Sequence, residues 1–122
     1  MWELSKTFRF EAAHTLARSI DMEPSRRIHG HSYRAEVTIR GMAAEDTGMV
    51  VDLGVIERAL EDVRACLDHH FLDEVAGLGP PTMENLSAWI WQRLAPSAPG
   101  LARVTVYRDS CGEVCSYFGP GR

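Results

Sequence analysis

The sequence predicts an α+β fold in which two helices pack on one face of a four-stranded antiparallel sheet. The first observation is the order of the hydrophobic patterns: two alternating stretches, two stretches with helical spacing, then two more alternating stretches. The second is the length of 122 residues, which is typical of one domain, without repeats, low-complexity segments or an internal linker. We therefore expect residues 1–122 to form a single domain with the order strand-strand-helix-helix-strand-strand.

The composition argues against several classes of protein. Hydrophobic residues make up 45% and charged residues 25% of the chain, as in ordinary globular domains. The net charge of −4 suggests no surface for nucleic acid or membrane, so an anion site must be built locally, for example from Arg26 and Arg27. The start of the chain does not resemble a signal peptide, and no apolar run approaches the length of a membrane span. With three cysteines, an odd number, we expect free thiols in the reducing cytoplasm.

The first two predicted strands carry three histidines in phase with their apolar faces. Residues 6–14 alternate: one parity holds the apolar residues from Phe8 to Ala12 and ends at His14, and the other holds Thr7, Arg9 and Glu11. From residue 29 the alternation returns, and His29 and His31 share a parity with the apolar residues that follow. Side chains two residues apart in a strand point to the same face, so both imidazoles can converge on one metal ion.

His14, at the end of the first strand, is the candidate for a third ligand. Three histidines with an open fourth position are typical of a catalytic zinc site rather than a structural one. The alternative is three unrelated core or surface histidines, which we would favour for any one of them alone. Their shared phase, their positions at strand ends and the His-x-His spacing favour the metal site. A β-bulge near Gly30 would change the parity and weaken this inference.

Local signals predict the remaining elements. Residues 15–28 lose the alternation and are expected to form a long loop of the kind that carries function. Asp52 and Thr82 are the expected N-caps of two amphipathic helices, the first ending near residues 68–70 and the second at Pro96. Residues 104–107 and 114–117 are expected to be the last two strands. Since no strand carries an obvious blocking device, we expect edge pairing into a homo-oligomer.

Several segments together resemble the 6-pyruvoyltetrahydropterin synthase family, which includes the bacterial 6-carboxytetrahydropterin synthases of queuosine biosynthesis. The resemblance covers nearly the whole chain, and its strength lies in the joint order and spacing of the segments. These are Phe8-Arg9-Phe10-Glu11-Ala12-Ala13-His14, His29-Gly30-His31-Ser32-Tyr33, Gly48-Met49-Val50-Val51-Asp52-Leu53, Leu67-Asp68-His69, Pro81-Thr82-Met83-Glu84-Asn85 and the strand that contains Tyr117.

The resemblance implies a fold, an assembly, a metal and a substrate. The fold would be the T-fold, in which subunits join their sheets into a barrel, usually as a dimer of trimers, so we expect a trimer or hexamer. The metal would be Zn2+, held by His14, His29 and His31. The substrate would be a small molecule, 7,8-dihydroneopterin triphosphate or a related pterin. A Lewis acid at its side-chain hydroxyls makes proton abstraction and loss of triphosphate feasible near neutral pH.

The resemblance also implies a catalytic role for the pair Asp68 and His69. A carboxylate fixes the imidazole tautomer and raises its basicity, which is what a proton shuttle requires. From the residues alone, a helix-end histidine beside an exposed aspartate is an equal alternative. Thr82 and Arg27 are expected to bind substrate, with Arg27 near the triphosphate, although a loop arginine can equally be solvated.

The chain departs from the family pattern in two places. The family's catalytic cysteine precedes the His-Gly-His motif by four or six residues, where this chain has Ser25 and Glu23. A serine hydroxyl needs its own base whereas a glutamate can act as one, so both are retained as catalytic candidates. The glutamate that anchors the pterin is matched by Asp109, which is one methylene shorter, and Glu113 lies close by in the sequence.

Three functional hypotheses follow. The first is a zinc-dependent pterin synthase, a carbon–oxygen lyase whose products are of the 6-pyruvoyl- or 6-carboxytetrahydropterin type. Triphosphate elimination, side-chain cleavage or both would give these products. The alternative is a pterin- or purine-binding homologue that keeps zinc but has lost the base. The third is a metal-stabilised structural oligomer, which would not need an open coordination position.

Overall fold

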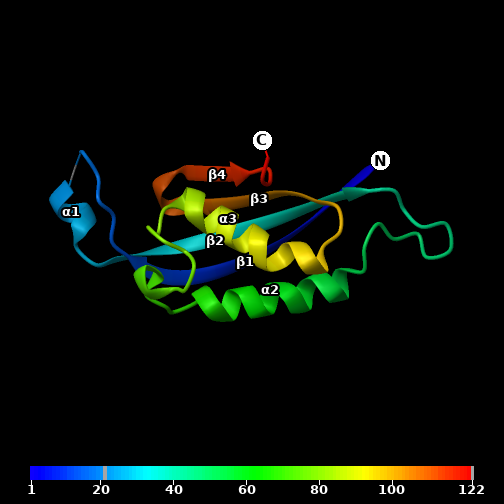
Figure 1. The fold of residues 1–122 in the computed structure, drawn as a ribbon, viewed down its shortest axis with the longest axis horizontal. Coiled ribbons are helices and arrows are strands. Elements are labelled where there is room, and N and C mark those ends of the chain that lie inside the picture. Colours follow the sequence, from blue (N-terminus) through cyan, green and yellow to red (C-terminus); the bar gives the residue numbers. More distant parts are fainter. Residues whose placement is uncertain (21, 122) are drawn as a thin grey trace.

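The computed structural model describes residues 1–20 and 22–121, which form one sheet and three α-helices (Figure 1). Neighbouring strands pair antiparallel in the order β1-β2-β3-β4. The strands are β1 (Trp2–His14), β2 (His29–Gly41), β3 (Leu101–Arg108) and β4 (Glu113–Tyr117). The α-helices are α1 (Met22–Arg26), α2 (Leu53–Leu67) and α3 (Met83–Leu94). The 3-10 helices are η1 (Leu72–Glu74), η2 (Ala95–Ser97) and η3 (Asp109–Cys111).

The predicted α+β class is confirmed. Helix α2 packs against β1, and α3 packs against β3 and β4, so the two long helices cover one face of the sheet (Figure 1). The single chain forms an open sheet, and a barrel would require further copies of it. None of the helices in residues 1–20 and 22–121 has the length and apolar character needed to cross a membrane.

Both predicted helix caps are present. The Asp52 carboxylate accepts the Gly54 backbone N–H at 2.8 Å, and the Thr82 hydroxyl accepts the Asn85 backbone N–H at 3.1 Å. The segment 15–28 differs from the loop that the sequence predicted, because it contains the five-residue helix α1. Its acidic first turn and basic last turn suit the helix dipole, a local signal that the loss of alternation obscured.

The core lies between the helix-covered face of the sheet and the two long helices. Alternate residues of the strands, such as Phe10, Ala35 and Val106, are at most 1% exposed and pack against Ile56 and Ile90 of the helices. This is the alternation that the sequence showed, and no register shift interrupts the pairing of β1 with β2. The one shift in the pairing of β2 with β3 occurs at residues 38–39, away from Gly30.

The outer edge of β1 is partly covered by the segment that follows α2. The His69 backbone N–H donates to the Glu11 carbonyl at 2.6 Å, and the Ala13 N–H donates to the His70 carbonyl at 3.2 Å. Phe71 then forms a parallel bridge with Ala13. The expectation that no strand edge is blocked is therefore wrong for this end of β1, while no described strand pairs with the outer edge of β4.

The turn into β3 gives a prediction about stability. Gly100 has a φ of +86°, and a Cβ there would lie 2.6 Å from the Arg40 carbonyl oxygen, whereas Gly112 has a φ of +66° and open space around it. We expect Gly100→Ala to lower the free energy of unfolding by about 3 kcal/mol and Gly112→Ala by about 1 kcal/mol. Both variants place a Cβ on a residue with positive φ, so comparing them by urea denaturation reports mainly the additional steric contribution at residue 100. Equal losses would contradict this account of the turn.

Candidate metal centre

The pairing of β1 with β2 brings the three histidines together. In the register of the two strands, His14 lies opposite His29, and Ala12 lies opposite His31. All three side chains follow the parity of the helix-covered face, where Phe10 and Tyr33 are buried. The imidazole ring centroids are separated by 4.6 Å for His14 and His29, 4.8 Å for His14 and His31, and 5.0 Å for His29 and His31. The predicted convergence of these residues is thus present in the fold.

The three rings present nitrogen atoms that suit a metal ion. One ligand atom from each histidine lies within 4.8 Å of the other two. His14 is 1% exposed, and its Nε2 is buried without a hydrogen-bond partner, as is the Nε2 of His31. Unpartnered buried nitrogens are costly unless something binds them, and three neutral imidazoles are a common donor set for zinc. The residues present therefore fit the metal that the sequence predicted.

Backbone carbonyls orient two of the rings. The Nδ1–H of His14 donates to the Pro81 carbonyl at 2.9 Å, and the Nδ1–H of His29 donates to the Arg27 carbonyl at 2.8 Å. These bonds select the tautomer in which Nε2 carries the lone pair, as is usual for metal-binding histidines. The sequence could not indicate them, because every residue carries a carbonyl and only the fold brings these two to the rings.

The environment of the rings favours their neutral forms. Burial lowers the pKa of His31 to about 4, and the positive charge of Arg108 adds to the effect. Burial also lowers the pKa of His14, although the hydrogen bond to Pro81 opposes that shift. Neutral imidazoles are the metal-binding form, so no proton has to leave these two rings at neutral pH.

Asp68 and His69 form a pair at the C-terminal end of α2. His69 Nδ1 lies 3.0 Å from the Asp68 carboxylate, which also accepts the Glu11 backbone N–H at 2.9 Å. That N–H is the largest cause of the lowered pKa of Asp68, followed among the lowering contributions by the bond to His69. His69 has a φ of 58°, the one positive φ of a non-glycine residue in the described part of the chain. Such strained backbone is enriched at functional sites.

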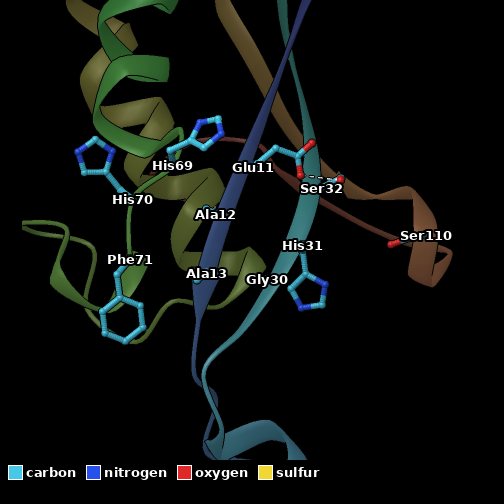
Figure 2. Close-up of a pocket in the computed structure, with 10 residues that line it drawn as sticks. All are labelled: Glu11, Ala12, Ala13, Gly30, His31, Ser32, His69, His70, Phe71 and Ser110. Atoms are coloured by element: carbon cyan, nitrogen blue, oxygen red, sulfur yellow. Dashed lines mark hydrogen bonds between the residues drawn. The ribbon is translucent and has the colours of Figure 1, made fainter.

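The pair and the metal centre do not meet within one chain. His69 is tied to the outer edge of β1, and Figure 2 shows it on the opposite side of that strand from His31. Between them runs an open groove whose lining includes Glu11, Gly30, Ser32 and Phe71, and in which the Ser32 hydroxyl donates to the Glu11 carboxylate at 2.6 Å (Figure 2). One wall of this groove is formed by residues 69–71, and the other by the start of β2, including His31.

Four other residues that the sequence suggested for the site differ in exposure and in hydrogen bonding. Glu23 and Arg27 are exposed, and the Arg27 backbone rather than its side chain contacts the metal centre. Ser25 is 5% exposed, and its carbonyl accepts the Leu16 N–H at 2.7 Å. The Thr82 hydroxyl caps α3. The described contacts bring none of these four side chains to the histidines.

Asp109 forms a two-point ion pair with Arg34, and its side chain is 52% exposed. Arg34 Nε and Nη2 donate to its two carboxylate oxygens at 3.1 and 3.2 Å, which lowers the pKa of Asp109. The Arg34 guanidinium also stacks over the Tyr107 ring at 3.7 Å from its centroid. Glu113, the neighbouring carboxylate, accepts from Arg108 Nη2 at 2.7 Å. Both acidic candidates, Asp109 just after β3 and Glu113 at the start of β4, are therefore ion-paired in this chain.

Sequence reasoning missed three side chains beside the histidines. Tyr33 shares their parity, Arg108 continues the buried parity of β3, and Cys111 Sγ lies 3.9 Å from His31 Nδ1. The parity of Tyr33 was visible in the sequence, although no role followed from it. Arg108 was overlooked because the strand was expected to end at residue 107, whereas it extends to 108. Nothing local in the sequence indicated the position of Cys111.

Comparisons with known proteins agree on one family. The family model described as 6-pyruvoyl tetrahydropterin synthase matches residues 3–120. The 6-carboxy-5,6,7,8-tetrahydropterin synthase of Synechocystis is 38% identical over 126 residues, covering 98% of this chain and 95% of that protein. The dihydroneopterin monophosphate aldolase of Pyrococcus furiosus is 31% identical over 91 residues, covering 75% of this chain and 73% of that protein.

Solved structures share the fold. The 6-pyruvoyl tetrahydropterin synthase of Caenorhabditis elegans superposes with a TM-score of 0.82 at 23% identity, covering 97% of this chain and 95% of that one. The Plasmodium vivax protein of the same description, solved with a catalytic glutamate replaced by alanine, gives a TM-score of 0.75 at 19% identity. It covers 95% of this chain and 96% of that one.

The geometry predicts which histidines bind metal. We expect His31→Ala to weaken zinc binding by about 100-fold or more, because it removes one of three ligands. His70→Ala is the matched control, since His70 is exposed and its ring contacts the Asp68 carbonyl rather than the centre. Competition titration with a chromophoric chelator measures both affinities. An unchanged affinity in the His31 variant would rule out the centre as described.

The lowered pKa of His31 predicts a pH dependence of the metal-free protein. The unfolded chain binds a proton at His31 near pH 6.5, whereas the folded chain does so only near pH 4. The contribution of neutral His31 to the free energy of unfolding is therefore full above pH 6.5 and is lost as the pH drops toward 4. We expect the thermal unfolding midpoint of wild type to fall more steeply over this window than that of His31→Gln. Parallel curves would show that His31 titrates alike in both states.

Proposed function

Since the chain belongs to the 6-pyruvoyl tetrahydropterin synthase family, we propose that it is a zinc-dependent pterin synthase acting on 7,8-dihydroneopterin triphosphate or a close relative. The observation that carries the proposal is the histidine centre, whose two orphaned Nε2 atoms and carbonyl-oriented rings suit a metal. The products would be of the 6-pyruvoyl- or 6-carboxytetrahydropterin type. The extensive match to the Synechocystis protein supports the second of these.

The metal would bind the His14, His29 and His31 nitrogens and supply Lewis acidity to substrate hydroxyls, so that an adjacent C–H loses its proton more readily. The chain itself has to position the substrate and move that proton. Three ligands from two paired strands give a rigid centre, because the strand register fixes the ligand positions. Rigidity of this kind favours the chemical step by holding the reacting groups in place.

We propose His69 as the residue that transfers the proton. Its Nδ1 is held by Asp68, so its Nε2 is free to accept or donate, and its ring is 79% exposed. The carboxylate stabilises the protonated imidazole as the proton arrives. Because His69 lies across β1 from the histidine centre of its own chain, it would serve the centre of a neighbouring subunit in a trimer or hexamer. The exposed edge of β4 is available for such an assembly.

Glu23 is the proposed replacement for the family's cysteine. A carboxylate can act as a base without prior deprotonation at neutral pH, whereas the hydroxyl of Ser25 cannot. The Plasmodium vivax protein also has a catalytic glutamate in this fold, which supports a carboxylate in the role. Ser25 is 5% exposed and its hydroxyl would need a base of its own, so it is the less suitable base.

A second candidate function is pterin or purine binding without catalysis. It is favoured by the absence of any cysteine before Cys66 and by the ion pair that occupies Asp109. In this case zinc and ligand would bind while no product forms. Calorimetry and turnover measurements on the same zinc-loaded protein separate the two functions.

The decisive assay incubates zinc-loaded protein with 7,8-dihydroneopterin triphosphate and follows tripolyphosphate release and the pterin products by mass spectrometry. We expect turnover, and a fall of about 100-fold or more in His69→Gln and Glu23→Gln. His70→Gln and Ser25→Ala are the matched controls and should retain most activity. Binding without turnover would favour the second function. Full activity of the His69 variant would rule out His69 as the residue that transfers the proton.

A further inference from the structure

The histidine centre lies at the open end of the β1–β2 pair. His14 and His29 are the last residues to pair, and residues 15–28 rather than a tight turn connect the two strands. The terminal pair of two strands frays easily, because nothing beyond it holds the strands together. A metal centre that needs fixed ligand positions therefore needs support from outside β1 and β2.

Residues 68–73, which we call the edge segment, lie along the outer edge of β1 at this end (Figure 2). Alternate backbone N–H groups of a strand point to the same edge, and three successive ones here have acceptors in the edge segment. Glu11 N–H donates to the Asp68 carboxylate at 2.9 Å, Ala13 N–H to the His70 carbonyl at 3.2 Å, and Thr15 N–H to the Asp73 carboxylate at 2.9 Å. The edge segment thus takes the place of a neighbouring strand where β1 carries its metal ligand.

Asp73 makes the last of these contacts, directly beside the ligand His14. One of its carboxylate oxygens accepts the Thr15 N–H, and the other accepts the Thr15 hydroxyl. Thr15 follows His14 in the chain and lies beyond the paired residues of β1 and β2. Hydrogen bonds to a carboxylate are charge-assisted, and two of them fix orientation as well as position. Asp73 therefore holds the backbone on the unpaired side of His14.

Asp73 is itself anchored in the core. It lies in η1, and its neighbour Leu72 in that helix is fully buried in the hydrophobic core. The next backbone contact along the chain, from the Leu16 N–H to the Ser25 carbonyl at 2.7 Å, instead joins two residues of the connection between β1 and β2. Asp73 thus links the end of β1 to the core, whereas the contact of Leu16 does not.

We propose that Asp73 is a positioning residue for the metal ligand His14 and acts through Thr15. Pro81 orients the His14 ring by accepting from Nδ1, whereas Asp73 fixes the backbone from which that ring projects. Loss of the carboxylate lets the end of β1 fray, which moves one of the three ligands relative to the other two. The inference rests on the proposed function for its metal centre, but not for its pterin substrate.

The test measures zinc affinity by competition with a chromophoric chelator. We expect Asp73→Ala to weaken zinc binding by about 10-fold or more, as is typical when support of a metal ligand is removed. Thr15→Val keeps the N–H donor and should lose about 3-fold, whereas Thr15→Ser keeps the hydroxyl and should retain wild-type affinity. Glu74→Ala is the matched control, because Glu74 is exposed in the same 3-10 helix and its N–H donates to Phe71 rather than contacting β1.

A spectroscopic readout separates positioning from general stabilisation. Co2+ bound in place of zinc gives visible absorption bands that depend on ligand geometry. We expect Asp73→Ala to change this spectrum and Glu74→Ala to leave it as in wild type, with circular dichroism establishing that each variant folds. A variant with lowered stability in urea but with wild-type zinc affinity and cobalt spectrum would overturn the proposal. If Asp73→Ala does not fold, equal zinc affinities of Thr15→Val and Thr15→Ser would overturn it.

The outcomes also distinguish this inference from the proposed function. If wild type binds zinc without pterin turnover, and Asp73→Ala still weakens that binding, the role of Asp73 stands and the proposed function fails. If wild type turns over the pterin and Asp73→Ala binds zinc as tightly as wild type, the role of Asp73 is overturned and the proposed function survives.

Discussion

The unbroken antiparallel pairing of β1 with β2 is the constraint on which the rest of the site depends. The two strands pair from Trp2 and Gly41 at one end to His14 and His29 at the other without a bulge. A slip of one residue would turn the side chains of one strand to the other face and separate the histidines. The same alternation that buries Phe10 and Tyr33 thus aims three imidazoles at one point. Core packing and ligand geometry are specified by one register.

Because one strand register sets both the core packing and the histidine positions, the sequence could predict both. Alternation marks a strand face because buried and exposed positions differ in polarity, so the α+β class and the convergence of His14, His29 and His31 followed from the residues. The caps Asp52 and Thr82 followed for a similar local reason. The carbonyls of Pro81 and Arg27 could not be predicted, because a backbone acceptor has no sequence signal. The partners of Asp109 and Glu113 could not be predicted either, because they depend on where β3 ends and where β4 begins.

The polar cluster next to the core shows the cost of building a site into a hydrophobic face. Arg108 and Tyr33 occupy positions on this face where apolar residues would pack without a desolvation penalty. Function rather than stability is the usual reason for such residues. The strained backbone of His69 belongs to the same class, since the left-handed conformation is unfavourable for any residue with a Cβ.

The hydrogen bond from His14 to the Pro81 carbonyl joins residues 67 positions apart. Contacts between residues far apart in the sequence tend to form later than local ones, so we expect this contact to form after β1 has paired with β2. The metal centre would then be absent from the folding transition state. An ion bound there would act mainly by slowing unfolding, and the loaded protein would be kinetically longer-lived without folding any faster.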